Sequence, residues 1–386
     1  MVIALLLLGL LLRLGWTFSR PATDVALAEL PDQVEYLQAG RNLLSGEGFW
    51  FDDARFGQRI HASRTIGYPL LVAMCRGQIR TVQIVQCFLD VSTALAVYLI
   101  ARRWLGYGRS LLAMALVIFN PLLVYFCPLI LSETLYVAML SWAVYFVTIP
   151  AMLIWGVVIA AISVHVRPSG VPMAAVLGAL GGLLNALPGK RNSTAAIYAI
   201  VGMAATVVVL SPWAIRNENI FGRRVWLSTN GGITMYDGFH PGATGASDQK
   251  FVKSMPEVRA MDELQRDSHF RKLSASAIAD DPRRAARLAF IKAGRTWSPI
   301  PLSQQFASPL YMAVGLLYTV PLFIFAAAGI FWNRLPARAR LLLIAPALVI
   351  TAMHAISVGS MRYRLPAEPM LCVLAAGAFS RKPEAK

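Results

Sequence analysis

The first long polar segment of the chain, residues 19–67, contains an acidic residue whose position suits proton transfer. Asp32 begins a helical pattern that runs to Leu44, with Glu35 and Tyr36 in its first turn. A carboxylate that stays ionised can accept a proton from a bound hydroxyl or amine, which is the task of a general base. Asp32 and Glu35 are also spaced as in a capping box, so Asp32 could instead cap this helix. The spacing leaves both roles open.

Arginines recur in connections that the hydropathy pattern places on the same side as Asp32. Arg64 comes just before Gly67-Tyr68-Pro69, and four more follow later in the chain: Arg167, Arg216, Arg362 and Arg364. Arginine binds phosphate oxygens in a bidentate fashion, so arginines from several connections fit an anionic ligand such as a lipid phosphate. They could instead pair with acids or contact lipid headgroups. For Arg64 and Tyr68, the alternative is a snorkelling cation and an aromatic ring at the membrane interface.

Two further polar residues stand out by their surroundings. Glu133 interrupts a long apolar stretch near the same surface, where ionisable groups usually face a cavity or a partner. Asn230 lies in Ser228-Thr229-Asn230-Gly231-Gly232, which indicates a strand-like start with a turn, and residues 257–293 look helical. Both residues are therefore candidates for substrate binding.

The composition requires an apolar environment for most of the chain. Of 386 residues, 57% are hydrophobic and 15% are charged, whereas soluble domains are about 45–50% apolar and about 25% charged. The four cysteines lie in or beside apolar runs, which excludes a secreted disulfide scaffold. The sequence therefore predicts an all-α polytopic membrane protein with about ten transmembrane helices. The expected spans are residues 1–18, 82–101, 110–127, 129–149, 151–166, 171–187, 194–213, 308–332, 340–358 and 366–380.

Basic residues give these spans an orientation. The formal charge of +16 indicates membrane topology rather than nucleic-acid binding, because Lys and Arg collect in cytoplasmic connections. With both termini cytoplasmic, the inside connections carry the clusters at 102–109, 190–191, 334–340 and 381–382. We read the first apolar run as a retained helix rather than a signal peptide. The chain then divides into an N-terminal transmembrane module with the outer loop 19–67 (1–213), an outer-face loop subdomain (214–306) and C-terminal transmembrane helices (307–386).

Several kinds of chemistry lack their usual motifs. The sequence has no phosphate-binding loop of the Gly-x-x-x-x-Gly-Lys-Ser/Thr type and no dinucleotide fingerprint. Its five histidines show no close ligand spacing, and no Asp-x-Asp occurs. We therefore expect neither a metal nor another cofactor.

The ordered set of motifs resembles the GT-C glycosyltransferases, in particular the protein-mannosyltransferase-like and lipid A aminoarabinose-transferase-like group. The resemblance starts in the first loop, at Asp32–Tyr36, Arg41–Leu44, Gly46–Phe49 and Gly67-Tyr68-Pro69. It continues through Ser132–Tyr136, Arg167–Gly170, Pro212–Asn217, Ser228–Gly232 and Arg364-Leu365-Pro366. Each piece is short, but the ordered set covers most of the chain.

The resemblance implies a polytopic helical transferase that takes a hexose or pentose from a polyprenyl-phosphate donor on the outer face of a bacterial inner membrane. Asp32 matches the acid of the family's first loop, which implies the general base. Family members often have a second acid directly after it, and Gln33 stands there in this chain. The acceptor class (lipid, glycan or protein) is left open. The residues expected to bind substrate are Glu35, Tyr36, Arg64, Tyr68, Glu133, Arg167, Arg216, Asn230, Arg362 and Arg364.

The expected reaction is a single, inverting and metal-independent displacement. Asp32 would deprotonate the acceptor, while Arg64, Arg216 and Arg362 or Arg364 would stabilise the departing phosphate. Two other functions are compatible with outer-face cations on apolar helices. A flippase for polyprenyl-linked sugars would more typically show internal symmetry, and a membrane assembly protein would not need the acid and arginines together.

Overall fold

The structure is a computed structural model, and it describes residues 1–302, 308–331 and 335–379. Arg334 and residues 381–382, used above for topology, lie outside the described residues. The helices of the first half are α1 (Val2–Phe18), α2 (Asp24–Leu27), α3 (Pro31–Ser45), α4 (Gly67–Met74), α5 (Ile79–Arg102), α6 (Tyr107–Ile118), α7 (Pro121–Phe126), α8 (Glu133–Val147), α9 (Leu153–Ile162) and α10 (Met173–Asn185). Those of the second half are α11 (Arg191–Phe221), α12 (Gly231–Phe239), α13 (Glu257–Ala260), α14 (Glu263–Asp280), α15 (Pro282–Thr296), α16 (Pro309–Phe331), α17 (Ala337–Ala355) and α18 (Glu368–Ala378).

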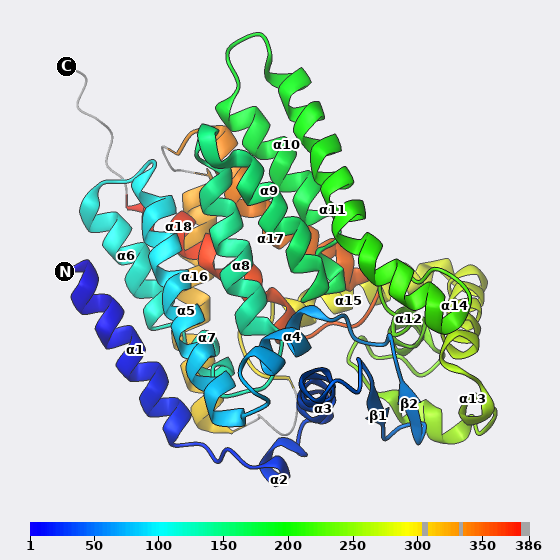
Figure 1. Ribbon diagram of the computed structural model, residues 1–386. Coiled ribbons are helices and arrows are strands. Elements are labelled where there is room, and N and C mark those ends of the chain that lie inside the picture. Colours follow the sequence, from blue (N-terminus) through cyan, green and yellow to red (C-terminus); the bar gives the residue numbers. More distant parts are fainter. Residues whose placement is uncertain (303–307, 332–334, 380–386) are drawn as a thin grey trace, which may run out of the picture.

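The expected all-α membrane architecture is confirmed. Each of the ten expected spans contains a helix of the bundle in Figure 1. Among the described residues, five segments are long and apolar enough to cross a bilayer: Ile79–Arg102, Pro168–Asn185, Arg191–Phe221, Pro309–Phe331 and Ala337–Ala355. Shorter apolar helices accompany them, at Val2–Phe18, Tyr107–Ile118, Glu133–Val147 and Pro150–His165. The chain is an integral membrane protein, and the count of ten spans stays a prediction.

Two helix ends differ from the expected spans for local reasons. The span 110–127 is divided at Asn120, whose side chain accepts hydrogen bonds from the amides of Leu122 and Leu123 and caps α7. Pro121, which lacks an amide hydrogen, follows as the first residue of α7. In the second case, α11 continues eight residues beyond 213 and stops at Gly222, which adopts a positive φ of 71°.

Small residues bring the membrane helices close together. A Cβ atom on Gly178 would lie 2.3 Å from the carbonyl oxygen of Tyr198, and one on Gly202 would lie 2.4 Å from that of Ala174. Gly178 and Gly182 are four residues apart on α10, as in a Gly-x-x-x-Gly packing face. The α10–α11 contact therefore depends on glycines, which have no side chain in the way. Apolar side chains alone would pack as well against lipid as against another helix.

A buried ion pair attaches α1 to this bundle. Arg13 is fully buried and pairs with Asp90 of α5, while its other nitrogens donate to the carbonyl oxygens of Val117 and Ile118 at the end of α6. An isolated charge at this depth would be costly, and the acid together with the carbonyl groups offsets that cost. Arg13 interrupts the first apolar run because it docks that helix.

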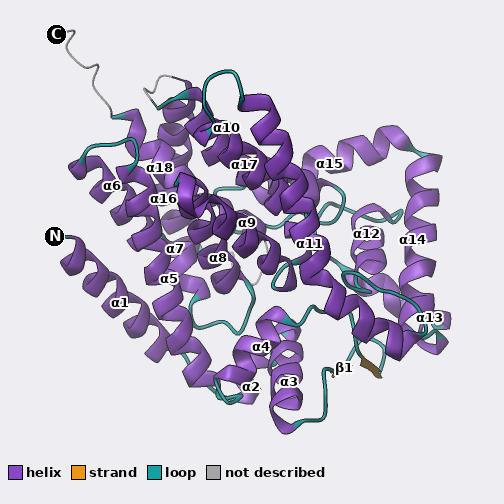
Figure 2. Ribbon diagram, turned by 45° about the horizontal axis from the view of Figure 1, so that its top comes forward, coloured by secondary structure: helices purple, strands orange, loops and turns teal. Residues whose placement is uncertain are grey.

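The polar segments gather at one end of the bundle. In Figure 1, α2, α3 and a hairpin lie along the lower edge, with α12, α13 and α14 beside the hairpin; Figure 2 shows the same grouping after a rotation. The hairpin pairs β1 (Phe51–Asp53) with β2 (Gln58–Ile60), so that Phe51 lies opposite Ile60. The strand-like start expected at 227–232 is wrong: residues 227–230 form no strand, and α12 begins at Gly231 because its first turns pack against α14. The helical prediction for 257–293 is confirmed by α13, α14 and α15.

Candidate functional site

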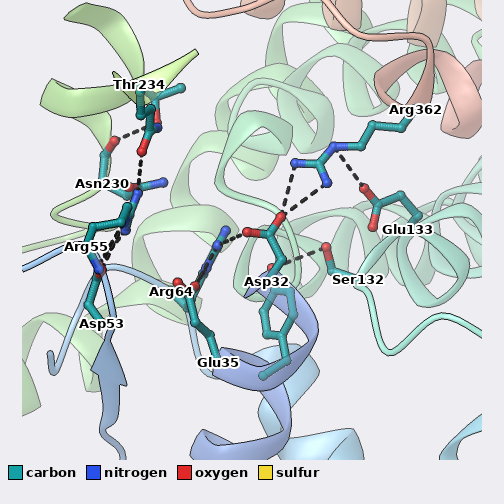
Figure 3. A network of polar contacts seen from close by, with 12 residues as sticks. Asp32, Glu35, Asp53, Arg55, Arg64, Ser132, Glu133, Asn230, Thr234 and Arg362 are labelled. Atoms are coloured by element: carbon teal, nitrogen blue, oxygen red, sulfur yellow. Dashed lines mark hydrogen bonds and ion pairs between the residues drawn. The ribbon is translucent and has the colours of Figure 1, made fainter. Parts of the chain in front are cut away.

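Asp32 does not cap α3. The helix begins at Pro31, its N-cap residue is Leu30, and no side chain accepts the free amides of the first turn. The carboxylate instead points toward two arginines from distant parts of the chain (Figure 3). The capping interpretation is therefore wrong, and the acid is available for other chemistry.

Two guanidinium groups share the two oxygens of Asp32. Arg64 Nη2 lies 2.5 Å from Oδ1, and Arg362 Nη1 and Nη2 lie 3.1 and 3.2 Å from Oδ2. Arg64 also donates through Nε to Glu35 Oε2 at 2.8 Å, one helical turn after Asp32. The side chain of Asp32 keeps 29% of its surface exposed. The arrangement holds the carboxylate between two cations while leaving it open to a ligand.

A second acid lies behind the first. Glu133, at the start of α8, is buried and pairs with Arg167 Nη1 at 2.8 Å; Arg362 Nε lies 3.7 Å from the same oxygen. Arg362 therefore contacts both Asp32 and Glu133 (Figure 3). Tyr363 lies beneath both cations, with Arg362 at 5.2 Å and Arg167 at 5.5 Å from its ring centroid. Three arginines and three acids thus form one half-buried network that is close to neutral.

The network sets the charge of its members. Burial alone would raise the pKa of Asp32, but the Arg64 and Arg362 guanidiniums hold it well below its usual value. Burial opposes the charge of Arg64 too, yet Asp32 and Glu35 raise its pKa well above the ordinary value. Asp32 is therefore ionised across the physiological range. A carboxylate stabilised this strongly is a weak base until its cations are given another anion.

Two tyrosines pack beside the arginine network: Tyr36 lies against Arg64, and Tyr68 lies against Tyr36. The Tyr36 hydroxyl donates to Ser132 Oγ at 3.4 Å, and its ring meets that of Tyr68 edge to face at 4.9 Å. The Tyr68 hydroxyl donates to Gln86 of α5 at 2.8 Å, and its side chain is fully buried. Burial raises the pKa of Tyr36, so its hydroxyl stays protonated. Tyr36 borders the arginines, while Tyr68 packs α4 onto the bundle.

Three of the expected residues lie apart from Asp32. Arg216 donates to the carbonyl oxygens of His61 and Phe49 at 2.6 and 2.7 Å and so attaches the first loop to α11. Arg364 is fully buried and donates to Glu368 at 2.6 Å, inside the bundle. Asn230 precedes α12, on the far side of Arg64 from Arg362 (Figure 3). The arginine cluster around Asp32 therefore consists of Arg64, Arg362 and, through Glu133, Arg167.

A group of residues beside Arg64 was missed by the sequence analysis. Arg55 donates to Asp53 at 2.9 Å through Nε, and Glu263 accepts hydrogen bonds from the backbone amides of His61 and Ala62 at 2.8 Å each. No motif marks these residues, and about 200 positions separate Glu263 from its partners. The charged residues that follow residue 50 were the available signal, but residue type does not identify contacts.

No cluster of three or more His, Cys, Asp or Glu side chains that could hold a metal ion occurs in the part of the chain that the structure describes. This observation does not test whether the reaction needs a metal ion, so a metal-independent reaction stays a prediction.

Comparison with solved structures identifies the fold. The Archaeoglobus fulgidus oligosaccharyltransferase tethered to an acceptor peptide matches 98% of this chain and 49% of its own, with a TM-score of 0.56 at 13% identity. The complex of the oligosaccharyltransferase AglB from the same organism with an inhibitory peptide and a dolichol-phosphate matches 98% of this chain and 50% of its own, with a TM-score of 0.54 at 12% identity. ArnT from Cupriavidus metallidurans bound to undecaprenyl phosphate covers 98% of this chain and 77% of its own at 10% identity, but its TM-score of 0.42 is too low to support an argument.

The chain thus spans about half the length of the oligosaccharyltransferases that it matches. No protein-family model matches the sequence, and no curated protein is similar to it in sequence. The resemblance to GT-C glycosyltransferases is confirmed as a likeness of fold.

Proposed function

We propose that this protein is a glycosyltransferase that moves a hexose or pentose from a polyprenyl-phosphate donor to an acceptor at the outer face of a bacterial inner membrane, with both termini cytoplasmic. One observation carries the proposal: an ionised Asp32 lies between Arg64 and Arg362 at the end of an apolar helix bundle. The fold supports it, since the oligosaccharyltransferase that matches this chain was solved with a dolichol-phosphate.

The arginine network suits the phosphate of such a donor. Arg64 and Arg362 now neutralise Asp32, and Arg167 neutralises Glu133. A lipid phosphate that entered between them would offer a further anion with bidentate acceptor oxygens to the same guanidinium groups. Binding of the donor would then loosen both ion pairs of Asp32, and its pKa would rise toward the ordinary value. Donor binding itself would in this way make Asp32 a better base.

The reaction is a single displacement with inversion at the anomeric carbon. The acceptor oxygen or nitrogen forms a bond to that carbon as the bond from carbon to the phosphate oxygen breaks. The acceptor's proton passes to Asp32, and the bonding electrons leave with the polyprenyl phosphate. Arg64 and Arg362 stabilise the charge that develops on that leaving group. No metal ion is required for any of these steps.

The other residues have positioning roles in this proposal. Glu35 orients Arg64, Glu133 and Arg167 orient Arg362, and Tyr36 borders the phosphate. We assign neither Arg216 nor Arg364 to the phosphate, because each is committed to contacts elsewhere. Tyr68 acts through Tyr36. The membrane lipids and an acceptor of unassigned class are the remaining partners.

The test is the substitution Asp32→Asn in the full chain, reconstituted in nanodiscs with a synthetic polyprenyl-phosphate sugar and a mixture of candidate lipid, glycan and peptide acceptors. Mass spectrometry of the lipid measures conversion to polyprenyl phosphate. We expect turnover to fall by about 10²–10⁴-fold, the usual contribution of a general base, while donor binding is kept, because the arginines lose a competing anion. Asp52→Asn is the matched control: this acid of the same loop is exposed and accepts from Gln38, so turnover stays at the wild-type rate. Unchanged turnover in Asp32→Asn would remove the proposed base.

A further inference from the structure

A narrow polar cavity adjoins the arginine network on the side of Arg64. It lies between the β1–β2 hairpin, the start of α12 and one face of α14. Ser63, the neighbour of Arg64 in the chain, forms part of its wall. Asn230 and Arg55 line it from the other side, and Figure 3 shows both next to Arg64. Its free space is that of about one water molecule, so a group of one or two heavy atoms fits.

The charged groups of this cavity are already engaged with protein partners, one pair by charge and the others by hydrogen bonds. Arg55 bonds to both oxygens of Asp53 and donates to Gln249 at 2.7 Å. Glu263 accepts three hydrogen bonds, and Arg266 donates to the backbone carbonyl groups of Val258 and Met261. A ligand that entered would find Arg55, Glu263 and Arg266 already hydrogen-bonded to groups of the protein. The cavity therefore favours a neutral group over an anion or a cation.

Two polar atoms of the wall are left without a partner. Ser63 is 8% exposed, and its Oγ has no hydrogen-bond partner within the described ranges. The same holds for Oδ1 of Asn230. Buried polar atoms are nearly always satisfied in folded proteins, so two such atoms on residues that line one cavity indicate a missing polar group. The group must both donate and accept, as a hydroxyl does.

The remaining walls are apolar and aromatic. Phe56 and Phe270 line the cavity together with Ile60 and Ile233. A group with a carbon part as well as a hydroxyl would contact these side chains and satisfy the polar atoms at once. Sugar rings carry such hydroxyl and hydroxymethyl arms. The distance from the reaction centre is short, because Ser63 is followed directly by the arginine that binds Asp32.

We infer that this cavity is a subsite for one hydroxyl or hydroxymethyl arm of a sugar ring, held by Ser63 and Asn230 beside Asp32. The inference rests on the proposed function, since the sugar belongs either to the donor or to the acceptor of that reaction. It adds a substrate class to that function: neutral sugars with a free hydroxyl or hydroxymethyl group at this position.

Ligand-observed NMR titrations of the full chain in nanodiscs, free of glycoside detergents, test the inference. The probes are methyl β-glucoside and methyl β-xyloside, which differ in the hydroxymethyl arm. We expect Ser63→Ala and Asn230→Leu each to weaken binding about fivefold or more, as loss of a hydrogen bond to a neutral ligand does. If only the glucoside is affected, the arm is the hydroxymethyl group; if both probes are affected, it is a ring hydroxyl.

A matched control separates binding from stability. Ser141 in α8 is a second buried serine whose hydroxyl has no partner among the described residues, and it is remote from the cavity in the fold. Ser141→Ala should leave glycoside binding unchanged. The melting temperature of Ser63→Ala should not fall, because its hydroxyl bonds to nothing in the empty protein. Binding that is absent from the wild type, or equal in the wild type and both cavity variants, overturns the inference.

A further titration shows whether the bound sugar belongs to the donor or to the acceptor. The glucoside is titrated in the presence of a polyprenyl-phosphate sugar: displacement identifies the donor sugar, and simultaneous binding identifies the acceptor. Asp32→Asn leaves the residues of the cavity wall unchanged. If glycoside binding depends on Ser63 but Asp32→Asn keeps full turnover, the proposed base is wrong and the subsite stands. If Asp32→Asn loses turnover but binding does not depend on Ser63, the subsite is wrong and the proposed base stands.

Discussion

At the scale of single residues, the ionisable side chains of this protein take their properties from partners far away in the chain. Asp32 receives Arg362 from 330 residues further on, and this ion pair helps to keep the carboxylate ionised. For Lys292 of α15, burial outweighs the effect of its charged neighbours. Its side chain is fully buried, with Nζ 3.3 Å from the centroid of the Phe239 ring and 3.3 Å from the carbonyl oxygen of Ala355.

Lys292 should make stability depend on pH. Burial lowers its pKa to about 7, an effect that Asp237 partly opposes, whereas in the unfolded chain the pKa is near its ordinary value of 10.5. Between these values the unfolded state binds more protons, so stability rises as the pH increases from 7 to about 10. The penalty for the buried charge is complete below pH 7. Lys292→Met should therefore raise the melting temperature more at pH 6 than at pH 10.

Thermal unfolding in detergent at the two pH values measures this effect. We expect the two gains to differ by about 2 °C or more, which corresponds to about 1 kcal/mol in a large domain. Lys253→Met, a substitution of an exposed lysine in the same subdomain, should give equal values at both pH values. An equal gain for Lys292→Met at pH 6 and pH 10 would show that Lys292 keeps its charge in the folded protein.

At the scale of elements, the bundle is held by close backbone approach as well as by apolar contact. Apolar side chains on α10 and α11 could face lipid at little cost, so apolar character does not select a partner helix. Glycines do, because Gly178, Gly182 and Gly202 let carbonyl groups of the opposite helix approach to where a Cβ atom would stand. At these positions even the methyl group of an alanine would be too close to the opposite backbone.

Gly202→Ala therefore tests the packing of α10 on α11. The added methyl group would meet the Ala174 carbonyl group at 2.4 Å, and overpacking of this kind costs about 1–3 kcal/mol. Gly15→Ala is the matched control, since nothing lies within 4 Å of a Cβ atom there. We expect a lower melting temperature for the first variant and an unchanged or slightly higher one for the second. Equal melting temperatures would mean that the two helices are less closely packed.

At the scale of the whole molecule, the two long polar segments, 19–67 and 214–306, form one cap at an end of the bundle because side chains connect them. Glu263 of α14 accepts the backbone amides of His61 and Ala62 just after β2, and the Thr229 hydroxyl before α12. Arg216 at the end of α11 attaches the same loop to the bundle through His61 and Phe49. These contacts fix Arg64 relative to the body that carries Arg362. The geometry around Asp32 thus depends on residues outside the arginine network.

Glu263→Gln should loosen this cap. The amide nitrogen of Gln cannot accept a hydrogen bond, so the backbone amide of His61 or Ala62 loses its acceptor, a change that costs about 1–3 kcal/mol. Hydrogen exchange at residues 58–62 should become about tenfold faster or more, since 1.4 kcal/mol corresponds to a factor of ten. Glu257→Gln, an exposed acid of α13, should leave exchange unchanged. Unaltered exchange in Glu263→Gln would show that the loops are held by other contacts.

Local sequence was sufficient for the class of fold. Long apolar runs interrupted by polar segments predict membrane helices whatever their arrangement, and each expected span contains one. The first acidic loop, the acid Asp32 and the arginines on its side could also be found from residue type and order alone. These features depend on composition and on short-range spacing, both of which the sequence displays directly.

Only the tertiary structure decided which of these residues meet. Arg362 and Arg364 are two positions apart, yet the turn that carries them directs one to Asp32 and the other to Glu368 inside the bundle. Arg216 was a candidate of the same kind, but the end of α11 points it at loop carbonyl groups. Contacts over hundreds of residues depend on how helices pack, and helix packing depends on glycines and buried ion pairs whose partners no local pattern specifies.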